Sequence, residues 1–395
     1  MNHKTRRTAA KLALPLSLCL LLLLAAVYLL PQNWQSASEL DMDVSEIPAS
    51  PLTAREGSSG FLVDNDFIVW GGFSGQKIDR QYHDDGAAYD TGTREWRPLP
   101  GAPMRAQYGH VAAMHPTGVA VFEVPPASGS EDYPISGHYL DLEQDEWNET
   151  APPPFDPGVR FEQDGVTVGD HLLFHTSEYI YSYDAESDEW ATHDAQSEVH
   201  RILTAAHPQE TGPDSEFYTV EENDAGLGLV NRRISDLTPI NVLPIPDSAE
   251  SDDYGIFLSE GDSIFVFLWL DDEVRVMRSL DSESGRGWEQ LDTASRGSFY
   301  APYSTSFPDS GVMFALDDKI ISSSPLGFSA YDVGNEEFFT HAGEFEESHG
   351  CGAGSALSPT ESGIIMWGGQ SCRPGGSGQI DTGYEVTIDS HGLSP

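Results

Sequence analysis

Four arginines occupy the same position in successive stretches of this sequence. They are Arg55 in PLTAR, Arg105 in APMRAQYGH, Arg160 in DPGVR and Arg201 in EVHR, and His349 in SHG takes the corresponding place near the C-terminus. A guanidinium group binds carboxylates through two parallel hydrogen bonds. If these side chains converge, they form a ring that binds an anionic ligand such as an acidic carbohydrate. The alternative is structural, with each arginine paired to a neighbouring acid or to backbone.

The sequence gives weaker indications of a catalytic or metal-binding site than of an anion-binding site. No nucleophile elbow, phosphate-binding loop or metalloprotease motif is found in the sequence. The histidines show no compact ligand spacing, so we expect surface or strand positions for them rather than a metal site; they include His83, His110, His171, His175, His200 and His207. The sequence therefore predicts no catalytic residue, no metal and no cofactor.

The composition indicates a folded and strongly acidic protein. Hydrophobic residues make up 39% of the 395 residues and aromatic residues 10%, which is ample for a packed core. The net charge is −44, from 64 acidic against 20 basic residues. A surface this negative repels phosphate backbones, so we do not expect nucleic acid as a partner.

The first 30 residues are expected to form a membrane anchor. Lys4, Arg6 and Arg7 precede an uncharged apolar run from Leu12 to Leu30, whose length as a helix is about 28 Å, close to the thickness of a bilayer core. The basic flank predicts a cytoplasmic N-terminus, followed by a single-pass signal anchor at 12–30 and a polar tether at 31–44. Residues 45–395 then form one domain outside the cytoplasm. The alternative is secretion after cleavage of a signal peptide.

A repeat runs through this domain. Asp, five residues and Trp occur in AAYDTGTREW, LDLEQDEW and YSYDAESDEW, which end at Trp96, Trp147 and Trp190. Trp288 and Phe338 continue the series with a spacing of roughly 49 residues, provided that one further unit lies between Trp190 and Trp288. The series predicts seven units, whose last strands lie near residues 47, 96, 147, 190, 239, 288 and 338.

Each unit is expected to be a small antiparallel sheet. Apolar runs of four to six residues alternate with turn residues, and Asp, Ser and Gly suit a hairpin turn between the third and fourth strands. Such a sheet buries both faces only when its neighbours cover it, as in a radial stack of blades. The repeated Trp is then a packing residue between blades.

Three features together resemble the kelch family. The stretches FIVWGG (67–72) and IIMWGG (364–369) end in Gly–Gly, and Tyr89–Asp90 precedes Trp96 by the family spacing. The units at 139–147 and 181–190 share only the second half of this pattern, and 201–247 and 251–293 hardly match. The resemblance implies an all-β, seven-bladed kelch-type propeller, with six blades as the alternative. Galactose oxidase has a propeller of this type, but no residue matches its copper site of Tyr, His and Cys-linked Tyr.

The ends of the domain predict how the ring closes. GYEVTIDS (383–390) has the pattern of the third strand of the last blade, so the missing fourth strand is expected from residues 43–50. Cys351 and Cys372 lie at the start of one strand and just past the end of its partner, and we expect a disulfide between them. The alternative is two unpaired thiols.

These features predict a membrane-anchored, extracytoplasmic propeller that acts as a binding module. Its partners are the membrane, through residues 12–30, and a protein or carbohydrate bound at the propeller loops. The alternative function is a carbohydrate-active or galactose-oxidase-like enzyme on the same scaffold.

Overall fold

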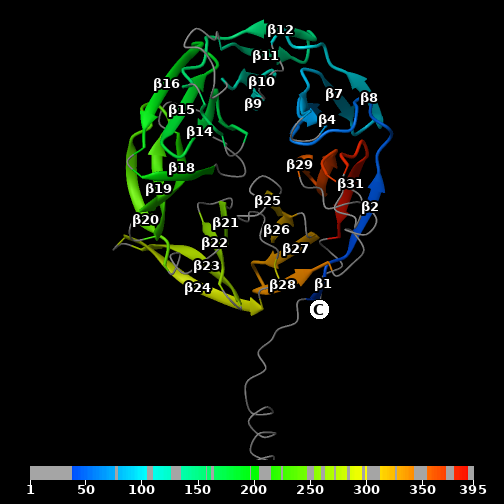
Figure 1. Cartoon of the computed structure of the whole chain (residues 1–395). Helices are drawn as coiled ribbons and strands as arrows, with labels where there is room; N and C mark the ends of the chain where they lie inside the picture. Colours follow the sequence, from blue (N-terminus) through cyan, green and yellow to red (C-terminus); the bar gives the residue numbers. More distant parts are fainter. Residues whose placement is uncertain are drawn as a thin grey trace, which may run out of the picture. The chain divides into compact units, whose positions relative to one another are not determined.

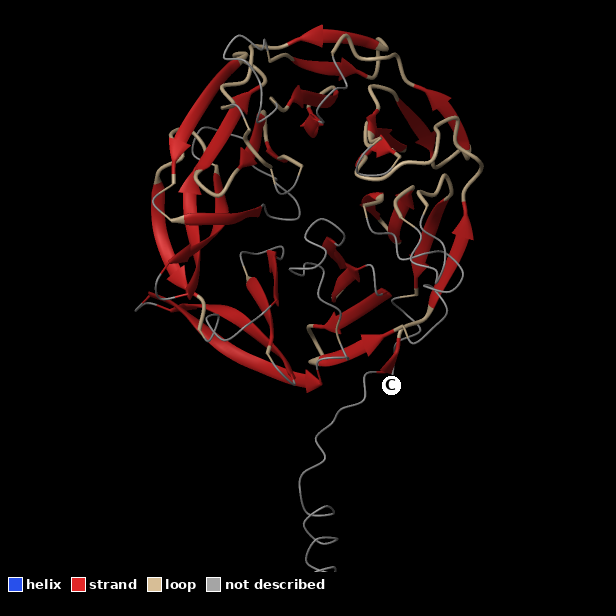
Figure 2. Ribbon diagram, viewed as in Figure 1, coloured by secondary structure: helices blue, strands red, loops and turns tan. Residues whose placement is uncertain are grey.

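A computed structural model shows a ring of seven β-sheets (Figures 1 and 2). The structure describes residues 38–389 except for 76–78, 105–109, 126–134, 157, 162–163, 196, 204–214, 224–225, 247–252, 259–262, 271–272, 283–284, 296–298, 300–311, 325–326, 342–353 and 371–377. These described residues form strands and turns, and no helix among them is long and apolar enough to span a membrane. The predicted anchor at 12–30 lies outside them and stays a prediction, as does the Cys351–Cys372 disulfide.

Every blade is a four-stranded antiparallel meander, in which the first strand lies near the centre of the ring and the fourth at its periphery (Figure 1). Blade 1 contains β3 (Ser59–Val63), β4 (Asp66–Trp70), β7 (Gly86–Asp90) and β8 (Glu95–Pro98), with a small hairpin of β5 (Phe73–Ser74) and β6 (Gln81–Tyr82) in between. Blade 2 contains β9 (His110–His115), β10 (Gly118–Glu123), β11 (Gly137–Asp141) and β12 (Glu146–Glu149). Blade 3 contains β13 (Val166–Val168), β14 (His171–His175), β15 (Tyr179–Asp184) and β16 (Glu189–Asp194).

The second half of the ring has longer strands in its first two blades. Blade 4 contains β17 (Glu198–Leu203), β18 (Glu216–Asn223), β19 (Gly226–Arg233) and β20 (Pro239–Pro244). Blade 5 contains β21 (Asp253–Leu258), β22 (Ile264–Trp269), β23 (Glu273–Ser282) and β24 (Gly285–Ser295). Blade 6 contains β25 (Val312–Leu316), β26 (Lys319–Ser324), β27 (Gly327–Asp332) and β28 (Glu337–Thr340). Blade 7 contains β29 (Ala356–Thr360), β30 (Gly363–Trp367), β31 (Gly383–Ile388) and β2 (Met42–Glu46). The seven fourth strands lie at or next to the predicted positions, so the ring has seven blades and not six.

The N-terminal strand closes the ring, as predicted. β2 pairs antiparallel with β31, with Met42 opposite Ile388 and Glu46 opposite Tyr384. One feature was not expected: β1 (Ser38–Glu39) adds a parallel strand to the outer edge of blade 6, with Ser38 opposite Phe339. Leu40, which lies between β1 and β2 in the chain, is fully buried. Residues 38–44, which were expected to belong to a tether at 31–44, are therefore part of the propeller, because they pair their backbone with two blades.

The hydrophobic core is divided among the blade interfaces. Seven clusters of buried apolar residues each join two successive blades, and one of them joins blade 7 to blade 1 through Ile47, Trp367, Phe67 and Tyr89. Each blade is therefore covered on both faces by its neighbours. This arrangement is the radial packing that a small sheet needs in order to bury its apolar residues.

The repeated Asp shapes the turn before the fourth strand. In the first blade Oδ1 of Asp90 accepts hydrogen bonds from the backbone N–H groups of Gly92 and Thr93, both at 2.8 Å. Asp141, Asp184 and Asp332 cap the same turn in other blades. The residue four positions after each Asp has a positive φ: Arg94, Asp145, Asp188 and Glu336. The carboxylate thus holds a turn whose left-handed residue is not glycine.

The repeated Trp fastens one blade to the next, as predicted. Its indole N–H donates to a backbone carbonyl just beyond, or at the end of, the fourth strand of the preceding blade. The donor–acceptor distances are 2.8 Å for Trp96 and Pro48, 2.7 Å for Trp147 and Pro100, 3.0 Å for Trp190 and Ala151, and 2.6 Å for Trp288 and Pro244. The apolar ring and its single donor are therefore both used at the blade interface.

The Gly–Gly pairs have a steric cause. Gly71 and Gly72 follow β4, and Gly368 and Gly369 follow β30, and all four have positive φ. A Cβ atom on Gly71 would come within 2.0 Å of the His110 imidazole in the next blade. A side chain is therefore excluded there both by the backbone conformation and by the neighbouring blade.

Candidate functional site

Arg55 is the best-defined member of the predicted arginine ring, and its donors are used within blade 1. It precedes β3, and its side chain is only 1% exposed. One Nη donates to Asp85 Oδ1 at 2.6 Å and to the Gly71 carbonyl at 3.1 Å, while Nε and the other Nη reach the Thr53 carbonyl and hydroxyl. Arg55 therefore fits the structural alternative better than ligand binding.

The pairing also acts on Asp85. Burial of this carboxyl raises its pKa, but the hydrogen bond and the positive charge of Arg55 outweigh that effect and hold the pKa below its ordinary value. Asp85 is 52% exposed, so the pair lies at the surface end of a buried arginine.

The other predicted site residues differ in position and in exposure. Arg160 lies in the segment before β13 and is exposed, and Arg201 lies in β17 and is partly buried. Arg55, Arg160 and Arg201 thus enter or precede the first strands of three blades, as expected. Arg105 and His349 lie outside the described residues, so convergence of the five side chains on one ligand stays a prediction.

Blade 4 departs from the repeat. It lacks the Asp and Trp of the motif, its strands β18 and β19 have eight residues each, and a β-bulge interrupts the pairing of β17 with β18 between Val199 and Arg201. Bulges redirect side chains and are common next to functional sites. His200 is the residue that the bulge leaves without a cross-strand partner.

A buried ion pair stabilises the middle of this blade. The side chains of Arg232 and Glu221 are 2% and 5% exposed, and Nη2 of Arg232 lies 2.6 Å from Oε1 of Glu221. Glu221 also accepts hydrogen bonds from the hydroxyls of Ser197 and Thr219, and Arg232 donates to the Leu237 carbonyl at 2.8 Å. The charge of Glu221 is therefore compensated locally, as a buried carboxylate requires.

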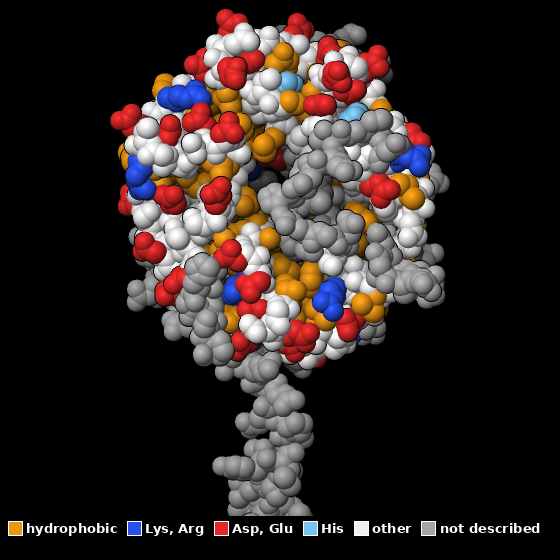
Figure 3. Space-filling view, turned by 180° about the vertical axis from the view of Figure 1, so that it is seen from behind, with side chains coloured by type: hydrophobic (Ala, Val, Ile, Leu, Met, Phe, Trp, Pro, Cys, Tyr) orange, Lys and Arg blue, Asp and Glu red, His pale blue; other side chains and the backbone are white. Residues whose placement is uncertain are grey.

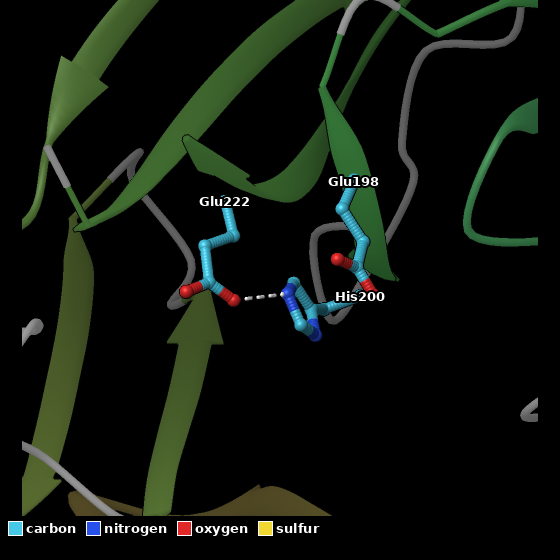
Figure 4. A group of neighbouring side chains, drawn as sticks. All are labelled: Glu198, His200 and Glu222. Carbon is cyan, nitrogen blue, oxygen red and sulfur yellow. Dashed lines mark hydrogen bonds and ion pairs between the residues drawn. The ribbon is translucent and has the colours of Figure 1, made fainter. Parts of the chain in front are cut away.

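Beside this pair, two glutamates and a histidine come together (Figure 4). Glu198 on β17 lies directly opposite Glu222 on β18, and His200 Nε2 is 2.9 Å from Glu222 Oε2. One possible ligand atom from each of the three residues lies within 4.8 Å of the others. Glu198 and Glu222 are exposed and His200 is partly buried. Among the described residues this is the one group of His, Cys, Asp and Glu with such a geometry.

His175, on β14 of blade 3, is electrostatically linked to the same region. Burial is the main cause that lowers its pKa to about 4, and the positive charge of Arg201 acts in the same direction. Its Nε2 atom has no hydrogen-bond partner in the part of the chain that the structure describes. His175 is therefore a neutral imidazole at neutral pH.

Sequence reasoning did not find the group formed by Glu198, His200 and Glu222. His200 was expected to be an ordinary strand or surface histidine, and it does lie on a strand. The alternation Glu–Val–His in EVHR was an available signal, since residues two apart share a face of a strand. Glu222, however, is placed by the pairing of β17 with β18, which no local spacing reveals.

The described surface of the propeller is predominantly acidic. Figure 3 shows Asp and Glu side chains scattered over one face and few Lys or Arg, in keeping with the net charge of −44. This face is hollowed at its centre, and hydrophobic side chains border part of the hollow. A cation near this surface meets an attractive field.

Comparisons with known proteins give no family. No family model matches the chain, and no curated protein matches it. A solved structure with a similar arrangement is the N-terminal domain of Nup159, with 12% identity and a TM-score of 0.47 over 89% of this chain and 97% of that one. A chain in a complex of S. cerevisiae Dbp5 bound to Nup159, Gle1, IP6 and ADP has 11% identity and the same TM-score, over 90% and 96% of the two chains. The kelch resemblance is not confirmed by these comparisons.

Proposed function

We propose that this protein is a membrane-anchored, extracytoplasmic binding protein with a kelch-type propeller. The apolar segment 12–30 holds it in the membrane, and the propeller binds a protein or carbohydrate ligand. The Gly–Gly pairs, the Asp-capped turns and the interblade Trp support the kelch-type repeat. The apolar run and its basic flank support the anchor.

One observation supports the position of the binding site. The sequence repeat is lost in blade 4, and several ionisable side chains lie close together in the same blade. Blades 1, 2 and 3 keep both the Asp-capped turn and the interblade Trp, blade 5 keeps the Trp, and blade 6 keeps the Asp-capped turn. Blade 4 instead has a bulge at His200, and Glu198 and Glu222 are exposed beside it. Departures from local regularity are expected where function, rather than packing, determines the residues. We therefore place the ligand at the inner end of blade 4.

The enzyme alternative gains no support from this cluster. A galactose-oxidase-like copper site needs tyrosine, histidine and a cysteine-linked tyrosine, whereas the group contains two glutamates and one histidine. Accessible carboxylates and an imidazole can hydrogen-bond hydroxyl, amide or ammonium groups of a ligand. This chemistry suits recognition of a polar surface.

A binding screen tests the proposed function. The full chain, purified in detergent, is applied to an array of neutral and acidic glycans, and in parallel to proteins labelled on the surface of the source cells. A ligand bound at blade 4 loses affinity for the Glu198→Gln, Glu222→Gln double variant but not for Glu189→Gln, an exposed glutamate on β16. A ligand that binds the double variant as well as the wild type would place the site elsewhere.

The anchor is tested separately. The intact chain is expected to sediment with membranes and to resist extraction by alkaline carbonate. Recovery of a mature protein from the medium, with an N-terminus beyond the apolar run, would instead establish the secreted alternative.

A further inference from the structure

We propose that Glu198, His200 and Glu222 bind a divalent transition-metal ion at the inner end of blade 4. The three side chains offer one nitrogen and up to four oxygens, and one ligand atom of each lies within 4.8 Å of the others. Ligand atoms around a tetrahedral zinc ion lie about 3.4 Å apart. A small rotation of the exposed glutamate side chains brings the three atoms to coordination distance.

The first argument is the position of the two glutamates. Glu198 and Glu222 face each other across β17 and β18, and like charges in this position destabilise a strand pair. In a chain of net charge −44, nearby acids increase the cost of the two carboxylates. A cation between them removes this repulsion.

The second argument is the local support of the site. The bulge at His200 turns the imidazole toward Glu222, with Nε2 2.9 Å from Oε2. The neighbouring carboxylate, Glu221, has its charge compensated by Arg232 and the hydroxyls of Ser197 and Thr219. That arginine is therefore engaged with Glu221, on the buried side of the strand pair, rather than with Glu198 or Glu222.

The donor set selects the kind of ion. Imidazole nitrogen with carboxylate oxygens suits zinc and neighbouring transition metals, whereas calcium and magnesium prefer oxygen ligands alone. Three protein ligands leave at least one coordination position open. Because the two glutamates are exposed, a carboxylate or hydroxyl group of a bound ligand can reach that position.

The competing explanation is a cluster without a metal, held together by the hydrogen bond between His200 and Glu222. A second competitor is unspecific binding, since the chain has 13 histidines and 64 acidic residues. The experiment must therefore compare variants rather than detect zinc in the wild type alone. It contains no glycan or protein ligand, so its outcome is independent of the proposed binding function.

Zinc binding is measured by isothermal titration of the metal-free full chain in detergent, with calcium titrated in parallel. We expect one tight zinc site and much weaker binding of calcium. His200→Gln and Glu222→Gln should each lower the zinc affinity of this site at least about tenfold, which is the low end for loss of even an outer-sphere partner. Glu189→Gln on β16 should leave the affinity unchanged. His200→Cys, which supplies a thiolate, should keep zinc binding.

Two outcomes would overturn the site. One is zinc affinity within about twofold of wild type in both His200→Gln and Glu222→Gln; the other is absence of a stoichiometric zinc site in the wild type. Circular dichroism of each variant checks the fold. If His200→Gln fails to fold, Glu198→Gln and His200→Cys decide the question, because the first removes an exposed ligand and the second retains one.

Discussion

Two arginines at the same place in the repeat have opposite environments. Arg55 is buried and donates to Asp85, Thr53 and Gly71, whereas Arg160 is exposed. The position therefore does not assign one role to all its members. Arg55 holds loop and strand residues of blade 1 together through buried hydrogen bonds.

Substitution distinguishes these roles. Arg55→Ala should lower the free energy of unfolding by about 2–4 kcal/mol, because it leaves a cavity and unsatisfied backbone and hydroxyl acceptors. Arg160→Ala, the matched exposed control, should change it by less than about 0.5 kcal/mol. Urea unfolding measures both values. Equal stabilities for the two variants would contradict the structural role of Arg55.

Buried histidines make the stability depend on pH. Burial lowers the pKa of His110 to about 4, and burial lowers that of His115 to about 4 despite the opposing charges of Asp141 and Asp170. In the unfolded chain a histidine titrates near 6.5, so between pH 6.5 and 4 the unfolded state binds more protons. The stability from neutral burial is complete above pH 6.5 and falls as the pH is lowered.

The expected slope is about 1.4 kcal/mol per pH unit for each such histidine within this window. Urea unfolding between pH 7.5 and 4.5 measures it. His115→Asn should lower the slope of the unfolding free energy against pH by the contribution of one histidine, even if it also changes the stability at pH 7.5. The aspartates with lowered pKa, such as Asp332, contribute below this window, since their stabilisation is lost only under more acidic conditions. A profile unchanged by His115→Asn would show that His115 titrates normally.

At the scale of an element, the Asp-capped turn is the recurring local unit. Asp141→Ala removes two hydrogen bonds from backbone N–H groups, at 3.0 Å each, and should lower the free energy of unfolding by about 1–2 kcal/mol. Asp141→Asn keeps the accepting oxygen and should cost less than about 0.5 kcal/mol. Thermal unfolding of both variants tests this ranking, with Glu143→Ala as the control inside the same turn. Equal losses for Asp141→Ala and Asp141→Asn would mean that the charge, rather than the accepting oxygen, holds the turn.

The turns and interblade tryptophans could be predicted from the sequence because their partners lie close along the chain or recur at a constant period. The spacing from Trp96 to Phe338 located all the fourth strands, including β20, which has no Trp. β1 could not be predicted, since a two-residue parallel pairing with β28 leaves no pattern in either segment.

The candidate site is formed by contacts between residues that lie far apart in the sequence, so no local pattern predicts them. Asp85 reaches Arg55 from 30 positions away, and Glu222 meets His200 from 22 positions away. The first contact joins two segments that lie just before β3 and β7, and the second depends on the register of β17 with β18, which a bulge shifts at His200. Sequence reasoning therefore placed Arg55 at the right strand but assigned its partner only in general terms, and it missed the cluster on blade 4.

At the scale of the whole molecule, the N-terminal strands should contribute strongly to stability. A chain that begins at Ala49 lacks β1 and β2 and loses Leu40 and Ile47, which are 1% and 3% exposed. Burial of two such side chains is worth at least about 3 kcal/mol. A chain that begins at Ala37 keeps both strands and is the control. Equal melting temperatures for the two chains would show that the ring does not depend on this closure.

The pairing of Met42 with Ile388 also sets the order of events when the chain is made. β2 is one of the first strands to leave the ribosome and the last to find its partner, because nearly every other residue of the propeller must be synthesised before β31 exists. Until then β2 has no antiparallel neighbour, although blades 1 to 6 can already stack as an open arc. A nascent chain arrested before Gly383 should therefore remain cleavable by protease around residues 42–47, and release of the last strand should protect them. Synthesis of β31 near the C-terminus therefore determines when the ring can close, although the strand that closes it, β2, lies near the N-terminus.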